Sequence, residues 1–114
     1  MSRRLEILKN AREVVARPKG WAKTWVEPTS ETEDGYAYCA LGAVKTAAGL
    51  LPYGTHWNAE TVEAALALAD VVPDRYVGSE RRSAAMNYND RTSQKCVVEL
   101  FDETIRREEA KETK

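Results

Sequence analysis

Apolar residues at helical spacing run through most of the chain. Residues 3–16 place apolar side chains on one stripe and charged side chains opposite, which predicts an amphipathic helix that ends before Pro18. Residues 38–48 are apolar or small almost all round, and Gly49 follows them. This pattern predicts a central buried helix with a left-handed glycine stop. Small residues such as Gly42 leave room for neighbouring helices to approach closely.

Capping residues mark three further helices. Asn58 precedes the first of them, Ser79 precedes a short helix that carries residues 84–86, and Thr92 or Ser93 precedes the last. The stripe expected to be buried in the helix after Asn58 is Val62, Ala65, Leu66 and Ala69. The stripe expected in the last helix is Cys96, Val97, Leu100, Phe101, Thr104 and Ile105.

Two short stretches alternate in the manner of β-strands. Residues 21–26 place Trp21 and Trp25 on one face of an extended segment, and residues 36–38 show the same alternation. The stretch between them is rich in Pro, Gly, hydroxyl and acidic residues, which is typical of a loop. We therefore expect a two-stranded antiparallel hairpin over about residues 21–38, packed against the helices because two strands alone are marginal in water.

Together these elements predict a mainly α fold, with about five helices packed around the central small-residue helix and a small two-stranded β-hairpin. The length of 114 residues fits one domain. We expect residues 1–105 to form this domain, and residues 106–114, which are charged almost throughout, to be a frayed C-terminal tail.

Charge is unevenly distributed along the chain, although the formal net charge is only −1. Residues 1–25 hold seven Lys or Arg and two acidic residues, whereas residues 26–70 hold seven acidic residues and one lysine. These two segments are expected to face each other or the solvent. The isoelectric point of about 5.9 argues against nucleic acid as a partner, since domains that bind it usually exceed about 9.

The sequence predicts a cytoplasmic protein that does not enter a membrane. It has no run of about 18 apolar residues and no signal-peptide core after its first residues. Cys39 and Cys96 are then expected to be free thiols, because the cytosol keeps thiols reduced, and to be buried, as free cysteines commonly are.

One set of residues suggests nucleophilic catalysis. Cys39 is expected at a helix N-terminus, which stabilises a thiolate, and His56 is the one histidine that could serve as its base. Asp90, Asn87 or Asn89 could orient that histidine. The competing interpretation is a buried, inert thiol, which is the common situation of a cysteine. Two cysteines and one histidine at these spacings give no metal site, and phosphate-loop and dinucleotide motifs do not occur, so no cofactor is expected.

Two other sets suggest binding. Trp21 and Trp25, with Lys23 between them, have the composition of a protein-contact surface, and the competing interpretation is that both indoles simply cover the helices. A polar junction between two predicted helices is the second set, and it comprises Asn87, Asn89 and Asp90. Such side chains bind ligands, but they also satisfy helix ends and turns.

Three motifs resemble those of a family of small uncharacterised proteins from actinobacteria and their phages. They are Gly20-Trp21 after the first helix, the aromatic-Cys-x-x-Gly-Ala pattern of residues 38–43, and the aromatic-Asn-Asp of residues 88–90. Tyr88 stands where many members have Trp. The resemblance implies a phage or actinobacterial origin, and it brings no assigned activity.

The sequence thus favours a non-catalytic, protein-binding accessory factor, acting on a host protein if it is phage-encoded. The alternative is a cysteine-dependent hydrolase or transferase that uses Cys39 and His56. Neither the identity of a partner nor the oligomeric state follows from the sequence.

Overall fold

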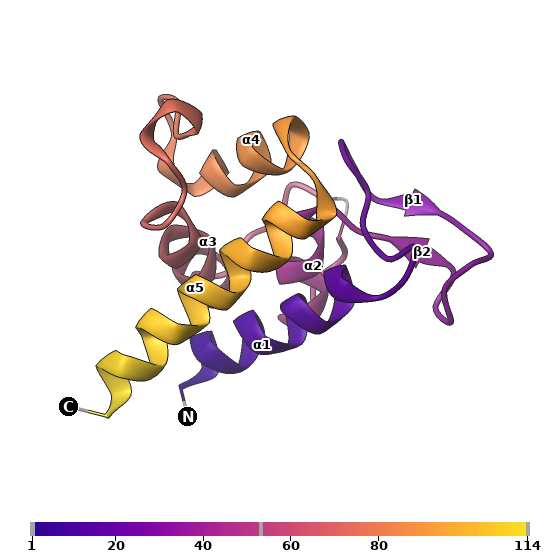
Figure 1. Cartoon of the computed structure of the whole chain (residues 1–114). Coiled ribbons are helices and arrows are strands. Elements are labelled where there is room, and N and C mark those ends of the chain that lie inside the picture. The colour runs from indigo at the N-terminus through magenta and orange to yellow at the C-terminus, as the bar shows by residue number, and fades with distance from the viewer. Residues whose placement is uncertain (1, 53, 114) are drawn as a thin grey trace.

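Helices make up most of the chain (Figure 1), and the computed structural model describes residues 2–52 and 54–113. Within these residues the elements follow in this order: α1 (Arg3–Ala16), β1 (Glu27–Pro28), β2 (Tyr36–Ala37), α2 (Ala40–Ala47), α3 (Ala59–Ala69), the 3-10 helices η1 (Asp74–Tyr76) and η2 (Arg81–Ser83), α4 (Ala84–Arg91) and α5 (Gln94–Glu112). The prediction of a mainly α fold with five α-helices and a small hairpin is confirmed.

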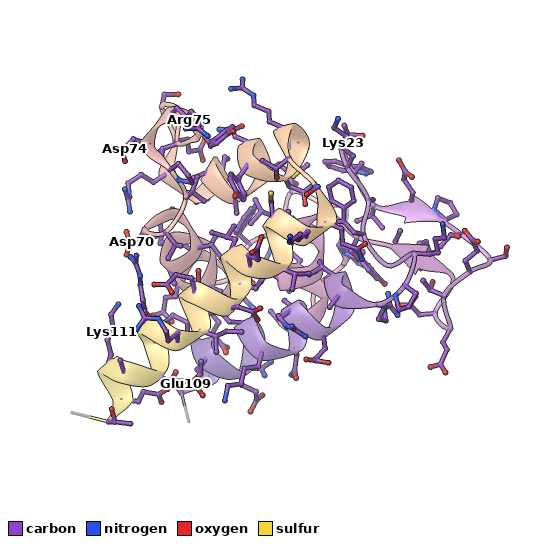
Figure 2. All side chains as sticks on the ribbon, viewed as in Figure 1. Lys23, Asp70, Asp74, Arg75, Glu109 and Lys111 are labelled. Atoms are coloured by element: carbon purple, nitrogen blue, oxygen red, sulfur yellow. The ribbon has the colours of Figure 1, made fainter. Side chains whose placement is uncertain are left out.

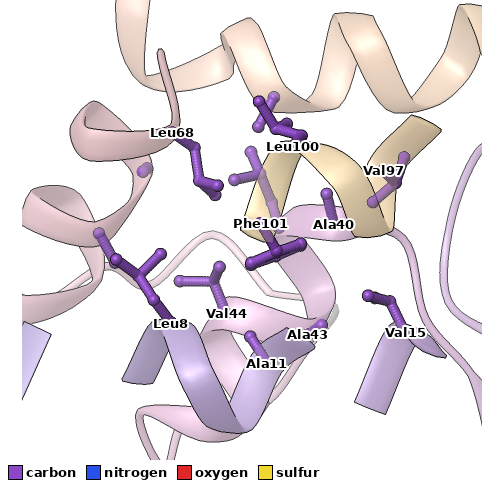
Figure 3. Close-up of a cluster of buried hydrophobic side chains, with 14 of the residues drawn as sticks. Leu8, Ala11, Val15, Ala40, Ala43, Val44, Leu68, Val97, Leu100 and Phe101 are labelled. Atoms are coloured by element: carbon purple, nitrogen blue, oxygen red, sulfur yellow. The ribbon is translucent and has the colours of Figure 1, made fainter. Parts of the chain in front are cut away.

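The helices surround α2. Helix α1 packs most extensively against α5 and α2. The start of α1 and the end of α5 lie close together, so the two chain ends are on the same side of the molecule (Figure 1). Figure 3 shows Phe101 of α5 at the middle of the core, with Leu8, Val44 and Leu68 from α1, α2 and α3 around it, and all four side chains are fully buried. No helix in the described part of the chain is long and apolar enough to cross a membrane.

Helix α2 is buried over its first six residues, from Ala40 to Lys45, as the run of small and apolar residues predicts. Its C-terminal stop is also as predicted. Gly49 has a φ of +85°, its N–H donates to the Thr46 carbonyl at 3.0 Å, and the Leu50 N–H donates to the Lys45 carbonyl at 2.9 Å. These two bonds satisfy carbonyls that the helix itself leaves unpaired.

The predicted stripe of α3 is correct in part. Ala65 and Ala69 are buried as predicted, but the buried face is turned away from Val62 and Leu66. Leu66 is 38% exposed, whereas Thr61, Ala64 and Leu68 are fully buried. The helix is rich in alanine and apolar on more than one side, so periodicity alone could not orient it. Its predicted cap is confirmed, because the Asn58 side chain accepts a hydrogen bond from the Thr61 N–H at 2.8 Å.

Of the caps predicted for the last two helices, the one for α4 is wrong and the one for α5 is confirmed. Ser79 does not cap α4: the 3-10 helix η2 intervenes, and α4 begins at Ala84. Ser93 caps α5, since its hydroxyl accepts from the Cys96 N–H at 3.3 Å. Thr92, the other candidate, instead donates its hydroxyl to the Tyr88 carbonyl at 2.7 Å.

The predicted two-stranded hairpin is confirmed, but its first strand lies later in the chain than predicted. Residues 21–26 were expected to form that strand, yet β1 follows them, and Trp21 makes only an isolated parallel bridge to Tyr38. The Ala22 N–H donates to the Tyr38 carbonyl, but the Ala22 carbonyl accepts from Asn89 of α4, so the backbone there turns toward the helices. The paired residues are Glu27 with Ala37 and Pro28 with Tyr36.

Helix α5 continues through the segment that was expected to fray. It runs to Glu112, because the buried Glu108 pairs with Arg4 of α1 at 2.6 Å, and Lys9 pairs with Glu109 at 2.9 Å. Figure 2 shows Glu109 on the last turns of α5. Lys114, the final residue of the predicted tail, lies outside the described residues.

The basic side chains of residues 1–25 form more ion pairs with α5 than with the acidic residues 26–70. Besides the pairs above, Arg12 contacts Asp102 at 2.9 Å. Two pairs do reach the acidic segment, Arg3 with Glu60 at 3.0 Å and Arg17 with Asp34 at 3.4 Å.

The turn after α1 requires glycine at position 20. A Cβ atom there would lie 2.7 Å from the Val14 carbonyl oxygen and 2.9 Å from the Arg17 Cβ. Both atoms belong to the end of α1, whose carbonyls at Val15 and Arg17 also accept hydrogen bonds from the Gln94 side chain at 2.9 and 3.0 Å.

Gly20→Ala should therefore lower the free energy of unfolding by about 1 to 3 kcal/mol, the usual cost of overpacking. Gly54→Ala is the matched control, because a Cβ at Gly54 would meet its nearest atom only at 4.0 Å, and it should change stability by less than about 0.5 kcal/mol. Urea unfolding followed by circular dichroism measures both. Equal stabilities of the two variants would contradict the tight turn.

Candidate functional site

A pocket of about 320 Å³ opens beside the N-terminal half of α2. Its apolar lining consists of Trp25, Leu41, Pro52, Trp57 and Met86. The polar and charged lining includes Cys39, Thr55, Lys45 and Arg82. We call this cavity the Trp57 pocket. Its walls come from α2, α4, η2, the segment before β1 and the loop between α2 and α3, so the tertiary fold assembles it.

Close packing on α2 places Trp25 at this pocket. A Cβ at Gly42 would lie 2.7 Å from the Val26 Cγ2, so the segment that leads into β1 rests directly on the glycine. Val26 is buried there, and the neighbouring Trp25 remains 55% exposed while lining the pocket. Trp25 therefore exposes part of a large apolar ring to solvent at the pocket.

Two cations lie over the Trp57 ring. The Lys45 ammonium is 5.0 Å and the Arg82 guanidinium carbon 5.2 Å from the ring centroid, both within cation–π range. Lys45 also donates a hydrogen bond to the Gly54 carbonyl. Burial lowers the pKa of Lys45, and the nearby Cys39 opposes that shift.

The two tryptophans singled out from the sequence have different surroundings. Trp21 is half-buried against the core, and its indole N–H donates to the Asn89 Oδ1 at 2.7 Å. Trp25 is exposed at the Trp57 pocket. They do not share one strand face, because the segment that holds them is not a strand.

Asn89 is fully buried, and its side chain bonds only within the fold. Its Oδ1 accepts from the Trp21 indole and from the Ala40 N–H at 3.0 Å. Its Nδ2 donates to the carbonyls of Ala22 at 3.0 Å and Lys23 at 2.5 Å. These four bonds match the capacity of a carboxamide, so Asn89 joins α4, α2 and the segment before β1.

The other polar candidates lie around this junction. Asn87 donates to the Tyr76 carbonyl at 3.0 Å, and the Lys23 side chain is exposed. Asp90 is half-buried with one buried oxygen, Oδ1, that has no hydrogen-bond partner among the described residues. Burial raises the pKa of Asp90, while the Asn89 side chain and the charges of Arg91 and Lys23 oppose the shift.

Cys39 caps α2 and is 4% exposed. Its Sγ accepts a hydrogen bond from the Gly42 N–H at 3.3 Å. Burial raises the pKa of the thiol, the Gly42 bond opposes this, and the charge of Asp90 adds to it. The helix N-terminus thus does not produce a stable thiolate here, because loss of hydration outweighs it.

His56 is exposed and does not line the Trp57 pocket. No hydrogen bond joins it to Cys39 in residues 2–52 and 54–113. The described residues thus show no contact through which His56 acts as the base of Cys39. The same described residues bring together no group of three His, Cys, Asp or Glu side chains able to hold a metal ion.

Comparison with known proteins gives a family. A family of unknown function, DUF6197, matches residues 1–107. The chain belongs to this family. The expectation of an uncharacterised family is thus confirmed in that general form. No curated protein and no solved structure matches the chain. The roles of residues in this DUF6197 protein must therefore be argued from its own geometry.

Among the lining residues that sequence reasoning missed in this DUF6197 protein are the cation–π group of Lys45, Trp57 and Arg82. One signal was present: Lys45 is the one charged residue in the otherwise apolar or small run of residues 38–48. A lysine inside a buried helix needs a specific environment for its ammonium group. Trp57 and Arg82 lie far from it in sequence, so only the fold brings the three together.

Removing the Asn89 carboxamide should destabilise the fold. Asn89→Ala leaves the buried Ala40 N–H and the Trp21 indole without their acceptor, which should lower the free energy of unfolding by about 3 kcal/mol or more. Asn10→Ala, at an exposed position of α1, should cost less than about 0.5 kcal/mol. Thermal and urea unfolding measure both, and similar stabilities would refute the central role of Asn89.

The two thiols should differ in reactivity. At pH 7 a maleimide should modify Cys39 on the order of tenfold more slowly than the half-buried Cys96, because burial disfavours the Cys39 thiolate. The rate at Cys39 should rise with pH through and beyond the ordinary thiol range near about 8.5. Peptide mapping by mass spectrometry reads each site, with urea-unfolded protein as the control for equal access. Rapid native labelling of Cys39 would revive the catalytic alternative.

Proposed function

We propose that this DUF6197 protein is a non-catalytic binding protein that receives a large apolar side chain of a partner protein in the Trp57 pocket. One observation carries the proposal: an exposed tryptophan, Trp25, lines the pocket, and a second tryptophan, Trp57, lines it too. Tryptophan dominates the energetic centres of protein interfaces, where a side chain of one partner fills a desolvated pocket of the other.

The size and surroundings of the pocket support a side chain as its occupant. About 320 Å³ is at the low end of the range of about 300 to 1,000 Å³ for small-molecule sites. Leu51, which precedes the lining residue Pro52, is also strongly exposed. An exposed apolar rim around an apolar pocket is typical of a surface that a macromolecular partner covers.

Catalysis receives less support from this geometry. The buried Cys39 makes no hydrogen bond to His56 among the described residues, and its N-cap bond to Gly42 gives the sulfur a structural role. The free state of both cysteines fits a reducing cytosol, which we propose as the location. The motifs of residues 20–21, 38–43 and 88–90 underlie the further proposal of an actinobacterial or phage origin, with a host protein as the target in the phage case.

Selection from a random-peptide display library tests the binding function without a known partner. Immobilised protein should enrich peptides that share one large apolar residue, the anchor residue. Trp25→Ala should weaken binding of synthetic versions of these peptides by about 2 kcal/mol, or roughly thirtyfold, because a hot-spot indole is lost. Fluorescence anisotropy measures the affinities.

Leu66→Ala is the matched control for this experiment. Leu66 is an exposed apolar residue on α3 that does not line the pocket, so its loss should change affinity by less than about twofold. Absence of any shared anchor residue, or equal losses in the two variants, would count against the Trp57 pocket as the binding site.

A further inference from the structure

Lys45 is a buried cation at the pocket without an acidic partner. The residue is 5% exposed, its ammonium lies over the Trp57 ring, and its hydrogen bond goes to the neutral Gly54 carbonyl. No carboxylate among the described residues forms an ion pair with it. A buried charge is costly unless an opposite charge compensates it, so this position suits an anion supplied from outside the fold.

Arg82 adds a second positive charge over the same ring. Its Nε contacts Glu80 at 2.6 Å, and its side chain is 45% exposed, so it remains open to solvent on the pocket side of η2. No acidic residue occurs among the described residues that line the Trp57 pocket. The pocket therefore combines apolar and aromatic walls with charge of one sign only, which favours a ligand that is apolar and anionic together.

We propose that the partner presents a peptide segment in which a large apolar residue is adjacent to Asp or Glu, with the carboxylate on Lys45 and Arg82. This inference rests on the proposed binding function and specifies the chemistry of the partner. The apolar side chain packs against Trp25, Trp57 and Met86. The carboxylate completes the hydrogen bonding of the Lys45 ammonium, which has three donors.

A short acidic segment fits the charge of the chain better than a polyanion does. Residues 26–70 carry seven acidic residues, and Lys45 is the one lysine in this range. One or two carboxylates suffice for the two cations at the pocket, whereas an extended nucleic acid needs more basic contacts than the pocket offers.

The selected peptides provide the test. Wild-type protein should enrich Asp or Glu within two positions of the anchor residue. In a synthetic peptide, replacing that Glu by Gln should weaken binding at least about tenfold, and the loss should shrink as salt is raised. The peptide change is made on the ligand, so its effect does not depend on how well any protein variant folds.

Lys45→Met should remove the preference for Glu over Gln, because it keeps the apolar stem and deletes the charge. Lys95→Met, at an exposed position at the start of α5, should retain the preference. A double-mutant cycle between Lys45→Met and the Glu→Gln peptide change isolates the contact from general losses. Lys45→Arg should preserve part of the discrimination, because it keeps the charge.

The outcomes separate this inference from the proposed function. Enriched anchor residues without acidic neighbours, or a Glu-to-Gln difference that Lys45→Met leaves unchanged, would overturn the acidic-segment proposal and leave the binding function standing. Failure to enrich any anchor residue would overturn both. Concentration-dependent self-association that is lost in Trp25→Ala, measured by sedimentation, would make a second copy the occupant and would also overturn the acidic-segment proposal.

Discussion

The four hydrogen bonds of the Asn89 carboxamide hold together the part of the molecule on which the site depends. They fix the start of α2 through the Ala40 N–H, the Trp21 indole, and the backbone that leads to Trp25. In the apolar interior each of these groups would be costly to leave unpaired, so the carboxamide specifies one arrangement of α4, α2 and the connecting segment. Two of these bonds engage the Ala22 and Lys23 carbonyls just after the Trp21–Tyr38 bridge, where the pairing of this segment with Tyr38 ends.

Helix α2 supplies the second constraint, which is steric. Its small residues admit close neighbours on every side, and Gly42 lets Val26 rest on the helix backbone. Packing there leaves Trp25 at the surface and forms the Trp57 pocket over the same helix. Core and candidate site thus share one element. A side-chain change on α2 acts on stability and on the pocket together, which is why the Lys45 variants are compared across a change made in the ligand.

Electrostatics divide the molecule into two regions. Along α1 and α5 the charges are paired: Arg4, Lys9 and Arg12 each contact an acidic residue of α5, and these contacts extend the last helix to Glu112. At the Trp57 pocket the charges are unpaired or only partly paired, since Lys45 has no acidic partner among the described residues. The exposed pairs among them, Lys9 with Glu109 and Arg12 with Asp102, contribute little to stability, because solvent screens their charges. The buried ammonium group of Lys45 instead favours an anionic ligand over a neutral one.

The sequence by itself determined where α1, α2 and α3 lie, the burial of α2, its Gly49 stop and the Asn58 cap, because these depend on periodicity and on local backbone chemistry within a few residues. Tertiary structure decided the rest. The face of the alanine-rich α3, the position of β1, and the separate surroundings of Trp21 and Trp25 depend on contacts between distant segments, such as the one between Asn89 and Ala22. The pocket also depends on contacts between distant segments. Lys45 of α2 and Arg82 of η2 lie over the ring of Trp57, which belongs to the loop after α2, and only packing brings the three together.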